Sequence, residues 1–477
     1  MKITTLFLFS LCWAWAVENT EPTAPPSTKA PAPPSTPTPT SAPVVAKPEI
    51  IAPNFHNEVR AILESSCVSC HGVNSQKGGL RLDTLALAKK GGDSGPAVVP
   101  GNRSESLLLE RIHLPSKDEE IMPPKGGPLS SQHKDILDRW VQTGAKWPRG
   151  IQLREVTEQE LVLRQKSKNK KLVSLAAYPP SISLKTEKDF NAIILVATYS
   201  DDVSRDVTYE SAMWLENPSI ADFQDRILYP KQDGETKLIA EFQGQKVLIP
   251  VKISEPTAPR PVSFKLDVMP VFMKAGCNTG SCHGSARGQD RFMLSLFGYD
   301  PKGDHYRITR EQGTRRINLA IPEESMLVEK AIGAVPHSGG KLFSKNSDHW
   351  KTLVNWLKDG AGKDPEDIAK PTKIELFPPS ALLEGNGATQ QMNVLAHYTN
   401  GTTRDITPLT VFQSSNDVSA AIDDKGLVTA GSRGEAFVMA RFNIFTVGVP
   451  VVVIPEDLKY ERPRLPENNY VDSLVHD

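Results

Sequence analysis

The sequence lacks the features of a nucleic-acid binder, a membrane-spanning protein and a disulfide-rich scaffold. Its 55 basic and 56 acidic residues leave a formal net charge of -1, so nothing favours nucleic acid or an anionic membrane surface. No segment reaches the roughly 18 consecutive apolar residues that a membrane-spanning helix needs. Five cysteines in 477 residues are too few for a fold held by disulfides. The length instead predicts a modular protein with more than one domain.

The N-terminal residues have the pattern of an export signal. Lys2 supplies a short positive region, residues 3–13 an apolar run, and Ala14-Trp15-Ala16 an A-x-A cleavage pattern. We therefore expect residues 1–16 to be removed and the mature protein to lie in the periplasm or at the cell surface. A lipid attached at Cys12 is the alternative, which the bulky leucine before it disfavours.

A low-complexity segment follows the signal. Residues 17–48 consist mainly of proline, threonine, serine and alanine. Such a composition buries too little apolar surface to fold, and it behaves as a stiff, extended spacer. We predict a disordered linker over these residues.

The first of two interleaved internal repeats pairs residues 49–150 with residues 260–366. Within it, ILDRWVQTGA (136–145) matches TLVNWLKDGA (352–361). Both segments space their apolar residues as a helix does and end at glycine, which is common at helix C-termini. Each unit therefore predicts a small all-α domain.

The second repeat pairs residues 172–255 with residues 371–455. YPPSISL (178–184) matches FPPSALL (377–383), and the surrounding stretches alternate apolar and polar residues around turns such as Asn400-Gly401. This alternation, interrupted by turns, predicts antiparallel β-sandwiches. The predicted fold class is thus multi-domain α and β, with two small all-α domains alternating with two antiparallel β-sandwich domains. Residues 151–171 are charged, and we expect a solvated linker there.

The motif that carries chemistry is Cys67-Val68-Ser69-Cys70-His71. Two thiols about a helical turn apart suit attachment to the two vinyl groups of haem, and the next histidine then ligates the iron. A local disulfide and a thioredoxin-like dithiol are the alternatives, but no strand–helix–strand pattern surrounds the motif. A zinc site would need further ligands, and this domain has no other cysteine. The motif predicts covalently bound haem c with His71 as an iron ligand.

Met122 is the expected second iron ligand of this haem. It is the sole methionine between residues 50 and 150, and it lies among prolines and glycines in Ile-Met-Pro-Pro-Lys-Gly-Gly. A lone methionine is ordinarily core filler, but here the prolines favour an extended loop that can present sulfur to iron. His113 is the alternative; its counterpart in the repeat is Ile332, which favours a packing role.

The second unit carries a longer variant of the motif, in which four residues separate Cys277 from Cys282 and His283 follows. Gly280 must let the intervening loop bulge so that both thiols still reach haem. VPHSGG (335–340) stands where MPPKGG stands in the first unit, so His337 replaces the methionine. These residues predict a second haem, with His283 and His337 as iron ligands. A disulfide-closed or empty pocket is the alternative.

The two predicted ligand sets differ in their electronic effect. A thioether ligand raises the reduction potential of haem iron, whereas two imidazoles lower it. The sequence therefore predicts a higher potential at Cys67/Cys70 than at Cys277/Cys282.

Taken together, the segments of the first unit resemble the planctomycete-type cytochrome c domain. The resemblance rests on CVSCHG, GGLRLD, GPAVVPG, SLLLERI, MPPKG and WVQTGAKWP. It implies that Cys67 and Cys70 bind haem and that His71 and Met122 ligate the iron. The sandwich segments resemble bacterial immunoglobulin-like (group 2) domains of surface adhesins.

The C-terminal residues also resemble part of that family. The phrase LPENNYVDSLVHD (465–477), within the tail 456–477, resembles the opening of a long C-terminal region in family members. The resemblance implies that this chain lacks that region, so we assign it no enzymatic activity from there.

Three functions are compatible with these features. The first is electron transfer outside the cytoplasm, with redox proteins as partners and no nucleic acid. The second is a dihaem peroxidase-like enzyme, which would need an open iron position if His337 does not ligate. The third is a surface polysaccharide-binding or adhesion protein in which haem is accessory, although neither sandwich shows an obvious aromatic platform or carboxylate cluster. Electron transfer is the leading hypothesis.

Overall fold

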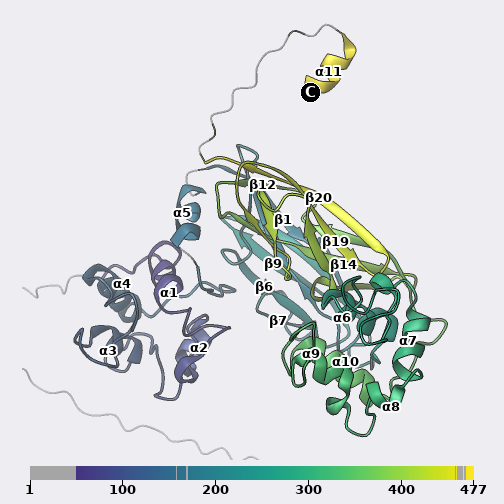
Figure 1. Ribbon diagram of the computed structural model, residues 1–477. Helices are drawn as coiled ribbons and strands as arrows, with labels where there is room; N and C mark the ends of the chain where they lie inside the picture. Colours follow the sequence, from purple (N-terminus) through teal and green to yellow (C-terminus); the bar gives the residue numbers. More distant parts are fainter. Residues whose placement is uncertain are drawn as a thin grey trace, which may run out of the picture. The chain divides into compact units, whose positions relative to one another are not determined.

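The computed structural model describes residues 50–156, 158–167, 170–456, 458, 466 and 469–476. The predicted signal (1–16) and linker (17–48) lie outside these residues, as does part of the tail 456–477. Helices and strands alternate in blocks along the described chain (Figure 1).

The first block is helical. Its elements are η1 (Phe55–Val59), α1 (Arg60–Ser66), η2 (Lys77–Gly79), α2 (Leu85–Lys90), α3 (Leu107–His113) and α4 (Ser131–Gln142). Helix α4 begins where the Ser130 hydroxyl accepts a hydrogen bond from the His133 backbone, and it ends before Gly144, whose φ is positive. Trp140 is buried in the core of this block and donates from Nε1 to the Lys146 carbonyl.

The third block repeats this arrangement. Its elements are η3 (Phe264–Val268), α6 (Met269–Lys274), η4 (Leu296–Gly298), α7 (Pro301–Thr309), α8 (Gly313–Arg316), η5 (Pro322–Glu324), α9 (Met326–Ile332) and α10 (Asp348–Lys358). Helix α10 is capped by Ser347, and Trp356 is buried and donates from Nε1 to the Gly362 carbonyl. The helices predicted from the two Trp-containing segments are therefore confirmed.

The second block contains ten strands. They are β1 (Leu172–Tyr178), β2 (Ile182–Leu184), β3 (Asn191–Ala192), β4 (Ile194–Tyr199), β5 (Ser204–Asp206), β6 (Ala212–Leu215), β7 (Ala221–Gln224), β8 (Ile227–Pro230), β9 (Gly234–Phe242) and β10 (Gln245–Ile253). They form three sheets, in the orders β1-β4-β5, β2-β10-β9-β6 and β3-β8-β7. Alternate residues of β9 and β10 are buried, which gives the sheet one apolar inner face.

The fourth block has the same topology. Its strands are β11 (Pro371–Phe377), β12 (Ala381–Glu384), β13 (Thr389–Gln391), β14 (Asn393–Tyr398), β15 (Thr403–Asp405), β16 (Val411–Ser414), β17 (Ala420–Ile422), β18 (Leu427–Ala430), β19 (Gly434–Phe442) and β20 (Phe445–Ile454), with η6 (Thr407–Leu409) after β15. The sheet orders are β11-β14-β15, β12-β20-β19-β16 and β13-β18-β17. Helix α11 (Tyr470–His476) follows near the C-terminus.

The prediction of purely antiparallel sandwiches is wrong in one respect. Strand β2 pairs in parallel with β10, and β12 pairs in parallel with β20. In each block the chain leaves the first strand at a Pro-Pro pair and then joins the other sheet beside its last long strand. Alternation of apolar residues reports which face is buried but not which strand is the neighbour, so the sequence pattern does not reveal this pairing.

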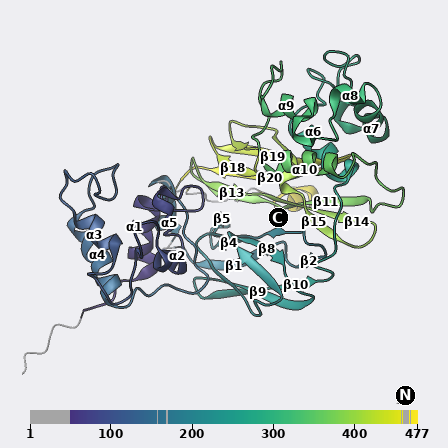
Figure 2. The same ribbon diagram turned by 90° about the horizontal axis from the view of Figure 1, so that it is seen from below.

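The two sets of strands lie side by side (Figure 2). They contact each other through reciprocal hydrogen bonds. Asp405, the last residue of β15, accepts from the Ala192 backbone N–H at the end of β3. Asp206, the last residue of β5, accepts from the Gln391 backbone N–H at the end of β13. Equivalent residues of the two repeats thus exchange the same contact, as in a two-fold symmetric dimer.

Further hydrogen bonds also join matching positions of the two repeats in both directions. Ser204 in β5 accepts from the Leu382 backbone N–H of β12, and Thr403 in β15 donates to the Ser183 carbonyl of β2. The rings of Tyr178 and Phe377, which match in the repeat, stack on each other with centroids 5.5 Å apart. The duplicated sequence therefore forms an internal interface between its own copies.

The connector at 151–171 is not the solvated linker that its charge suggests. It contains helix α5 (Glu158–Ser167), and Arg164 of this helix is buried. The Arg164 guanidinium pairs with Glu64 of α1 at 2.5 Å and lies 3.4 Å from Glu210. Arg60 of α1 also pairs with Glu64, at 2.9 Å, and donates to the Glu210 carbonyl. Charge runs are usually solvated, but here opposite charges from three segments neutralise one another inside the protein.

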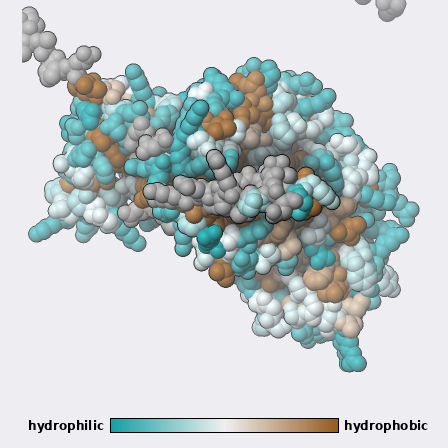
Figure 3. Space-filling view, turned by 90° about the horizontal axis from the view of Figure 1, so that it is seen from above, coloured by the Kyte–Doolittle hydropathy of each residue, from teal (hydrophilic) through white to brown (hydrophobic). Residues whose placement is uncertain are grey.

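The surface differs from this interior in character. On the face shown in Figure 3, hydrophobic residues form separate patches within a largely hydrophilic surface. The large aliphatic side chains are concentrated in four buried clusters, one for each block of elements. Burial of this apolar surface is the main driving force for folding each block.

Replacing Asp405 with asparagine should weaken the internal interface. The carboxylate accepts from the Ala192 N–H with one oxygen and from the Thr407 N–H and hydroxyl with the other. An amide has one acceptor oxygen, so a buried N–H would lose its partner, at a cost of about 1–3 kcal/mol. We expect Asp405→Asn to lower the free energy of unfolding by this amount in chemical denaturation. The exposed control Asp202→Asn should change it by less than about 0.5 kcal/mol; equal stability of both variants would contradict the interface.

Acid should remove a second inter-domain contact. Burial raises the pKa of Asp267 in η3, but Arg404 at 2.7 Å and Arg260 outweigh this effect and hold the pKa below its usual 3.8. A lowered pKa in the folded state stabilises the protein above pH 3.8, and this contribution is lost as the pH falls through the folded-state pKa. The stability difference between the wild type and Asp267→Asn should therefore shrink below about pH 4. Unfolding titrations at stepwise pH measure this, and a constant difference would count against the ion pair.

Candidate haem sites

The first cysteine motif continues directly from helix α1. The Cys67 N–H donates to the Leu63 carbonyl at 3.0 Å, which extends the helical winding past its last residue. The Cys70 N–H and the His71 N–H both donate to the Cys67 carbonyl, at 3.2 and 3.0 Å. The two cysteines and the histidine therefore share one tight turn, which suits attachment of one haem through both thiols with the imidazole alongside.

The second motif keeps this geometry in spite of its two additional residues. The His283 N–H donates to the Cys277 carbonyl at 3.0 Å, the distance found between His71 and Cys67. The inserted residues form a bulge in which the Cys282 N–H turns back to the Thr279 carbonyl, also at 3.0 Å. Bulging of the loop, predicted at Gly280, thus leaves the relation between the first cysteine and the histidine unchanged.

The residues after each histidine are also arranged alike. Leu82 donates to the His71 carbonyl at 2.7 Å, and Leu294 donates to the His283 carbonyl at 2.8 Å. A Cβ added at Gly72 would lie 2.5 Å from the Val68 carbonyl oxygen, and one at Gly284 would collide with the Asn278 carbonyl oxygen. Each motif therefore needs glycine after its histidine, because the chain passes too close to its own backbone for a side chain.

Burial favours the neutral form of both motif histidines, which is the form that binds a metal ion. Burial lowers the pKa of His71, although the carbonyls of Lys77 and Leu80 oppose this shift. Burial also lowers the pKa of His283, although the hydrogen bond between its Nδ1 and the Phe292 carbonyl, at 2.8 Å, opposes this shift. A neutral imidazole that donates from Nδ1 keeps a lone pair on Nε2 for a metal ion.

The four cysteines are free thiols in this structure. Burial raises the pKa of Cys67 and of Cys277 to about 12 in each case, and the second cysteine of each motif adds to the shift. Dithiol redox centres of the thioredoxin type instead lower the pKa of the exposed attacking thiol. The environment of these cysteines therefore fits attachment of a cofactor better than thiol exchange.

The rings of His283 and His337 lie near each other in the second unit. Their rings are nearly parallel, with an angle of 9° between the planes, and their centroids are 6.3 Å apart. An imidazole nitrogen lies about 2 Å from a bound metal ion. Two rings that bind one ion from opposite sides therefore have centres about 6 Å apart once the ring size is added. The observed separation fits two imidazoles that share one iron.

Hydrogen bonds and packing hold His337 in this position. Its Nδ1 lies 3.1 Å from the Gly340 carbonyl, which leaves Nε2 available, as in His283. A Cβ at Gly339 would lie 2.9 Å from Cε1 of the His337 ring and push it away. Gly339 and the carbonyls of Phe292 and Gly340 were not predicted from the sequence, because a backbone acceptor has no residue-type signature.

The structure separates the two candidates for the second ligand in the first unit. Met122 lies in the loop after α3 and packs, partly buried, against the core that contains Cys67. His113 at the end of α3 directs Nε2 to the Asp138 carboxylate at 3.0 Å, so this nitrogen already has a partner. Met122 therefore stays the candidate ligand.

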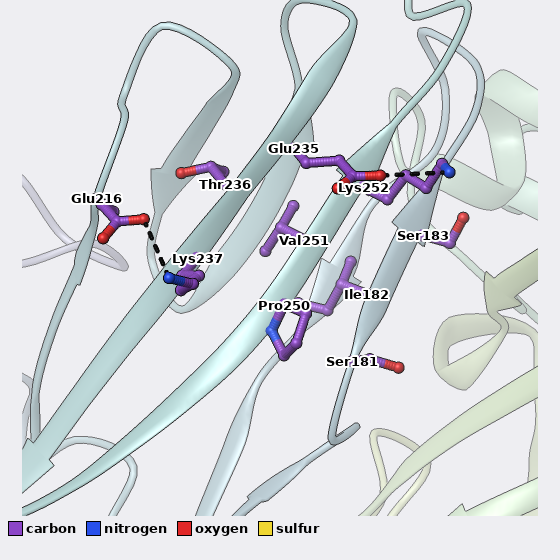
Figure 4. Close-up of a pocket in the computed structure, with 10 residues that line it drawn as sticks. All are labelled: Ser181, Ile182, Ser183, Glu216, Glu235, Thr236, Lys237, Pro250, Val251 and Lys252. Carbon is purple, nitrogen blue, oxygen red and sulfur yellow. Dashed lines mark ion pairs between the residues drawn. The ribbon is translucent and has the colours of Figure 1, made fainter.

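A groove elsewhere on the surface lacks the residue types of the two cysteine motifs. Figure 4 shows a shallow groove on the sheet that contains β2, β10 and β9. Its charged residues pair with each other across the strands, Lys237 with Glu216 and Lys252 with Glu235. None of the ten residues drawn is a histidine or cysteine. This groove therefore has none of the cysteine and histidine side chains that attach haem c.

The described residues lack two other features. They contain no group of three or more His, Cys, Asp or Glu side chains placed to bind a metal ion. Haem iron does not need such a group, because the porphyrin supplies four of its ligands. None of the helices in the described ranges combines the length and the apolar character needed to cross a membrane.

If His337 ligates the iron of a second haem, its removal should leave that iron with one protein ligand fewer. We expect His337→Ala to convert the absorption spectrum of one haem from a six-coordinate to a five-coordinate form and to leave the other unchanged. Gly339→Ala should have the same effect in weaker form, because it displaces the ring without deleting it. The exposed His133 serves as the control. An unchanged spectrum in His337→Ala would show that this residue is not a ligand.

Three solved structures that this chain resembles are distant from it in sequence. Domains 5–6 of the S-layer protein SbsC match at 8% identity and a TM-score of 0.24, over 60% of this chain and 99% of that chain. Domains 4–9 of SbsC match at 11% identity and a TM-score of 0.24, over 68% of this chain and 36% of that chain. The extracellular domains 3–5 of Drosophila OTK match at 7% identity and a TM-score of 0.13, over 60% of this chain and 63% of that chain. TM-scores this low do not show a fold shared with this chain.

Comparison with families is more informative. A search of curated proteins gives no match. The family model of planctomycete cytochrome C matches residues 67–126, a span that begins at Cys67 and includes Cys70, His71 and Met122. The match thus begins at the first cysteine of the first motif and ends just after the candidate methionine ligand. Residues 67–126 thus match the planctomycete cytochrome C family, which confirms the resemblance and indicates a c-type cytochrome.

Proposed function

We propose that this protein is an exported c-type cytochrome that binds two haems covalently and transfers electrons outside the cytoplasm. The single observation that carries the proposal is the parallel pair of His283 and His337 rings, 6.3 Å apart, beside a motif with the same backbone turn as Cys67–His71. The family match supports the first haem, and the shared geometry supports the second.

In the first unit, Cys67 and Cys70 would hold haem c, and His71 and Met122 would ligate its iron. The turn that joins the two cysteines would hold both thiols close enough to attach one cofactor. When bound, haem supplies a one-electron couple between ferric and ferrous iron, with the electron taken from a donor protein and passed to an acceptor protein. The core around Leu63 and Met122 would exclude water from one side of the cofactor.

In the second unit, Cys277 and Cys282 would hold haem, with His283 and His337 as ligands. Hydrogen bonds from Nδ1 of both rings to backbone carbonyls would orient them and fix which nitrogen is free. The same pairing argues against a peroxidase, since that activity needs an open or displaceable iron position. Contact of the sandwiches with a glycan or a cell surface stays a prediction.

The architecture supports a division into four folded domains, at 49–150, 172–255, 260–366 and 371–455. The blocks of helices and strands fall within these limits. Export to the periplasm or cell surface rests on the pattern in residues 1–16, which lie outside the described part of the chain.

The haem count is the decisive test. The full chain, exported in a host with haem-attachment machinery, should gain the mass of two haems. Cys67→Ala/Cys70→Ala and Cys277→Ala/Cys282→Ala should each lose one. A redox titration of the wild type should then resolve two potentials, the higher one belonging to the Met122-ligated haem, because thioether ligation favours ferrous iron.

Three other results would overturn parts of the proposal. A gain of one haem that disappears with the first pair of cysteines would make the second unit a haem-free copy. No gain at all would remove the proposed function entirely. Two haems with a single common potential would contradict the assignment of different ligands.

A further inference from the structure

Phe292 contacts the His283 imidazole in two ways. Its backbone carbonyl accepts the hydrogen bond from Nδ1 at 2.8 Å. Its own ring lies against the imidazole with centroids 4.7 Å apart and an angle of 49° between the planes. The orientation of His283 therefore depends on the position of Phe292, through both its backbone and its side chain.

Arg316 lies on the Phe292 ring. The central carbon of its guanidinium group is 4.3 Å from the ring centroid, a distance at which a cation is attracted to the π face. Arg316 is only 9% exposed, and its Nη1 donates to the carbonyls of Arg307 and Glu311. These contacts hold the charge in place. The Glu311 carboxylate lies 3.8 Å from the Arg316 guanidinium but is half exposed. Solvent therefore screens the negative charge, and Glu311 neutralises only part of the Arg316 charge.

The first unit has no such arrangement. Leu82 and Leu294 make the same hydrogen bond to the two motif histidines, and two residues before them stand Leu80 and Phe292. Leu80 offers no π face to a cation. A buried arginine held on a ring beside the motif histidine is therefore a feature of the second unit alone among these two sites.

We infer that Phe292 and Arg316 are positioning residues for His283 and that the Arg316 charge raises the reduction potential of the second haem. The inference rests on the proposed function, since it concerns a haem at Cys277/Cys282. Loss of an electron adds positive charge at the iron, and a fixed cation nearby opposes that gain. The charge thus partly offsets the lowering of the potential by two imidazole ligands.

The test is a spectroelectrochemical titration of the full two-haem protein and its variants. Arg316→Leu should lower the potential of the second haem until the ratio of reduced to oxidised form falls by about tenfold at a fixed potential, which is about 59 mV for one electron. Arg315→Leu is the matched control, because its exposed charge lies next to Arg316 on α8 and should change the ratio less than twofold. The first haem is the internal reference and should not shift.

A second variant covers the case in which Arg316→Leu does not fold. Phe292→Leu recreates the Leu80 environment, keeps the backbone carbonyl and should also lower the second potential. It should further alter the electron paramagnetic resonance signal of that haem, because the His283 ring loses its neighbour. An unchanged second potential in a variant that carries both haems would overturn the inference and leave the proposed function intact. Equal shifts of both haems would overturn it as well, and a wild type that lacks the haem at Cys277/Cys282 would instead remove the second haem from the proposed function.

Discussion

The hydrogen bond from the motif histidine N–H to the carbonyl of the first cysteine is the contact on which both candidate sites depend. It measures 3.0 Å for His71 and Cys67 and again for His283 and Cys277. Because a backbone bond of this kind fixes the path of the chain, the imidazole starts from the same point whether two or four residues separate the cysteines. The extra residues are accommodated in a bulge, and the ligand position is retained.

Polar contacts join the blocks around these sites, in addition to apolar contacts such as the stack of Tyr178 on Phe377. Carboxylates accept backbone N–H groups across the two sets of strands, as the half-buried Asp206 and the buried Asp405 do. Glu64 receives Arg60 and Arg164 close to the first motif. A buried charge without a partner is costly, so each such contact strongly favours one arrangement over its alternatives. The helical units are therefore attached to the strands in a defined geometry.

The two units are alike in backbone and differ in what surrounds the histidine. Met122 and His337 occupy loops after equivalent helices, and Leu80 and Phe292 occupy equivalent positions beside the imidazole. Ligand identity and nearby charge are the main means by which a protein adjusts haem iron. In the proposed function, one duplicated scaffold would thus carry two redox centres of different potential.

The sequence by itself determined the helices with Trp140 and Trp356 and the family at residues 67–126, because periodicity and the cysteine motif are local properties. The tertiary structure decided the rest. The parallel strand pairs, the docking of Arg164 and the approach of His337 to His283 join residues distant in sequence, and no local pattern reports which partner is met. The same holds for Phe292, whose carbonyl meets His283 only after the chain has turned back, since a backbone acceptor is present at every residue and becomes specific only through the fold.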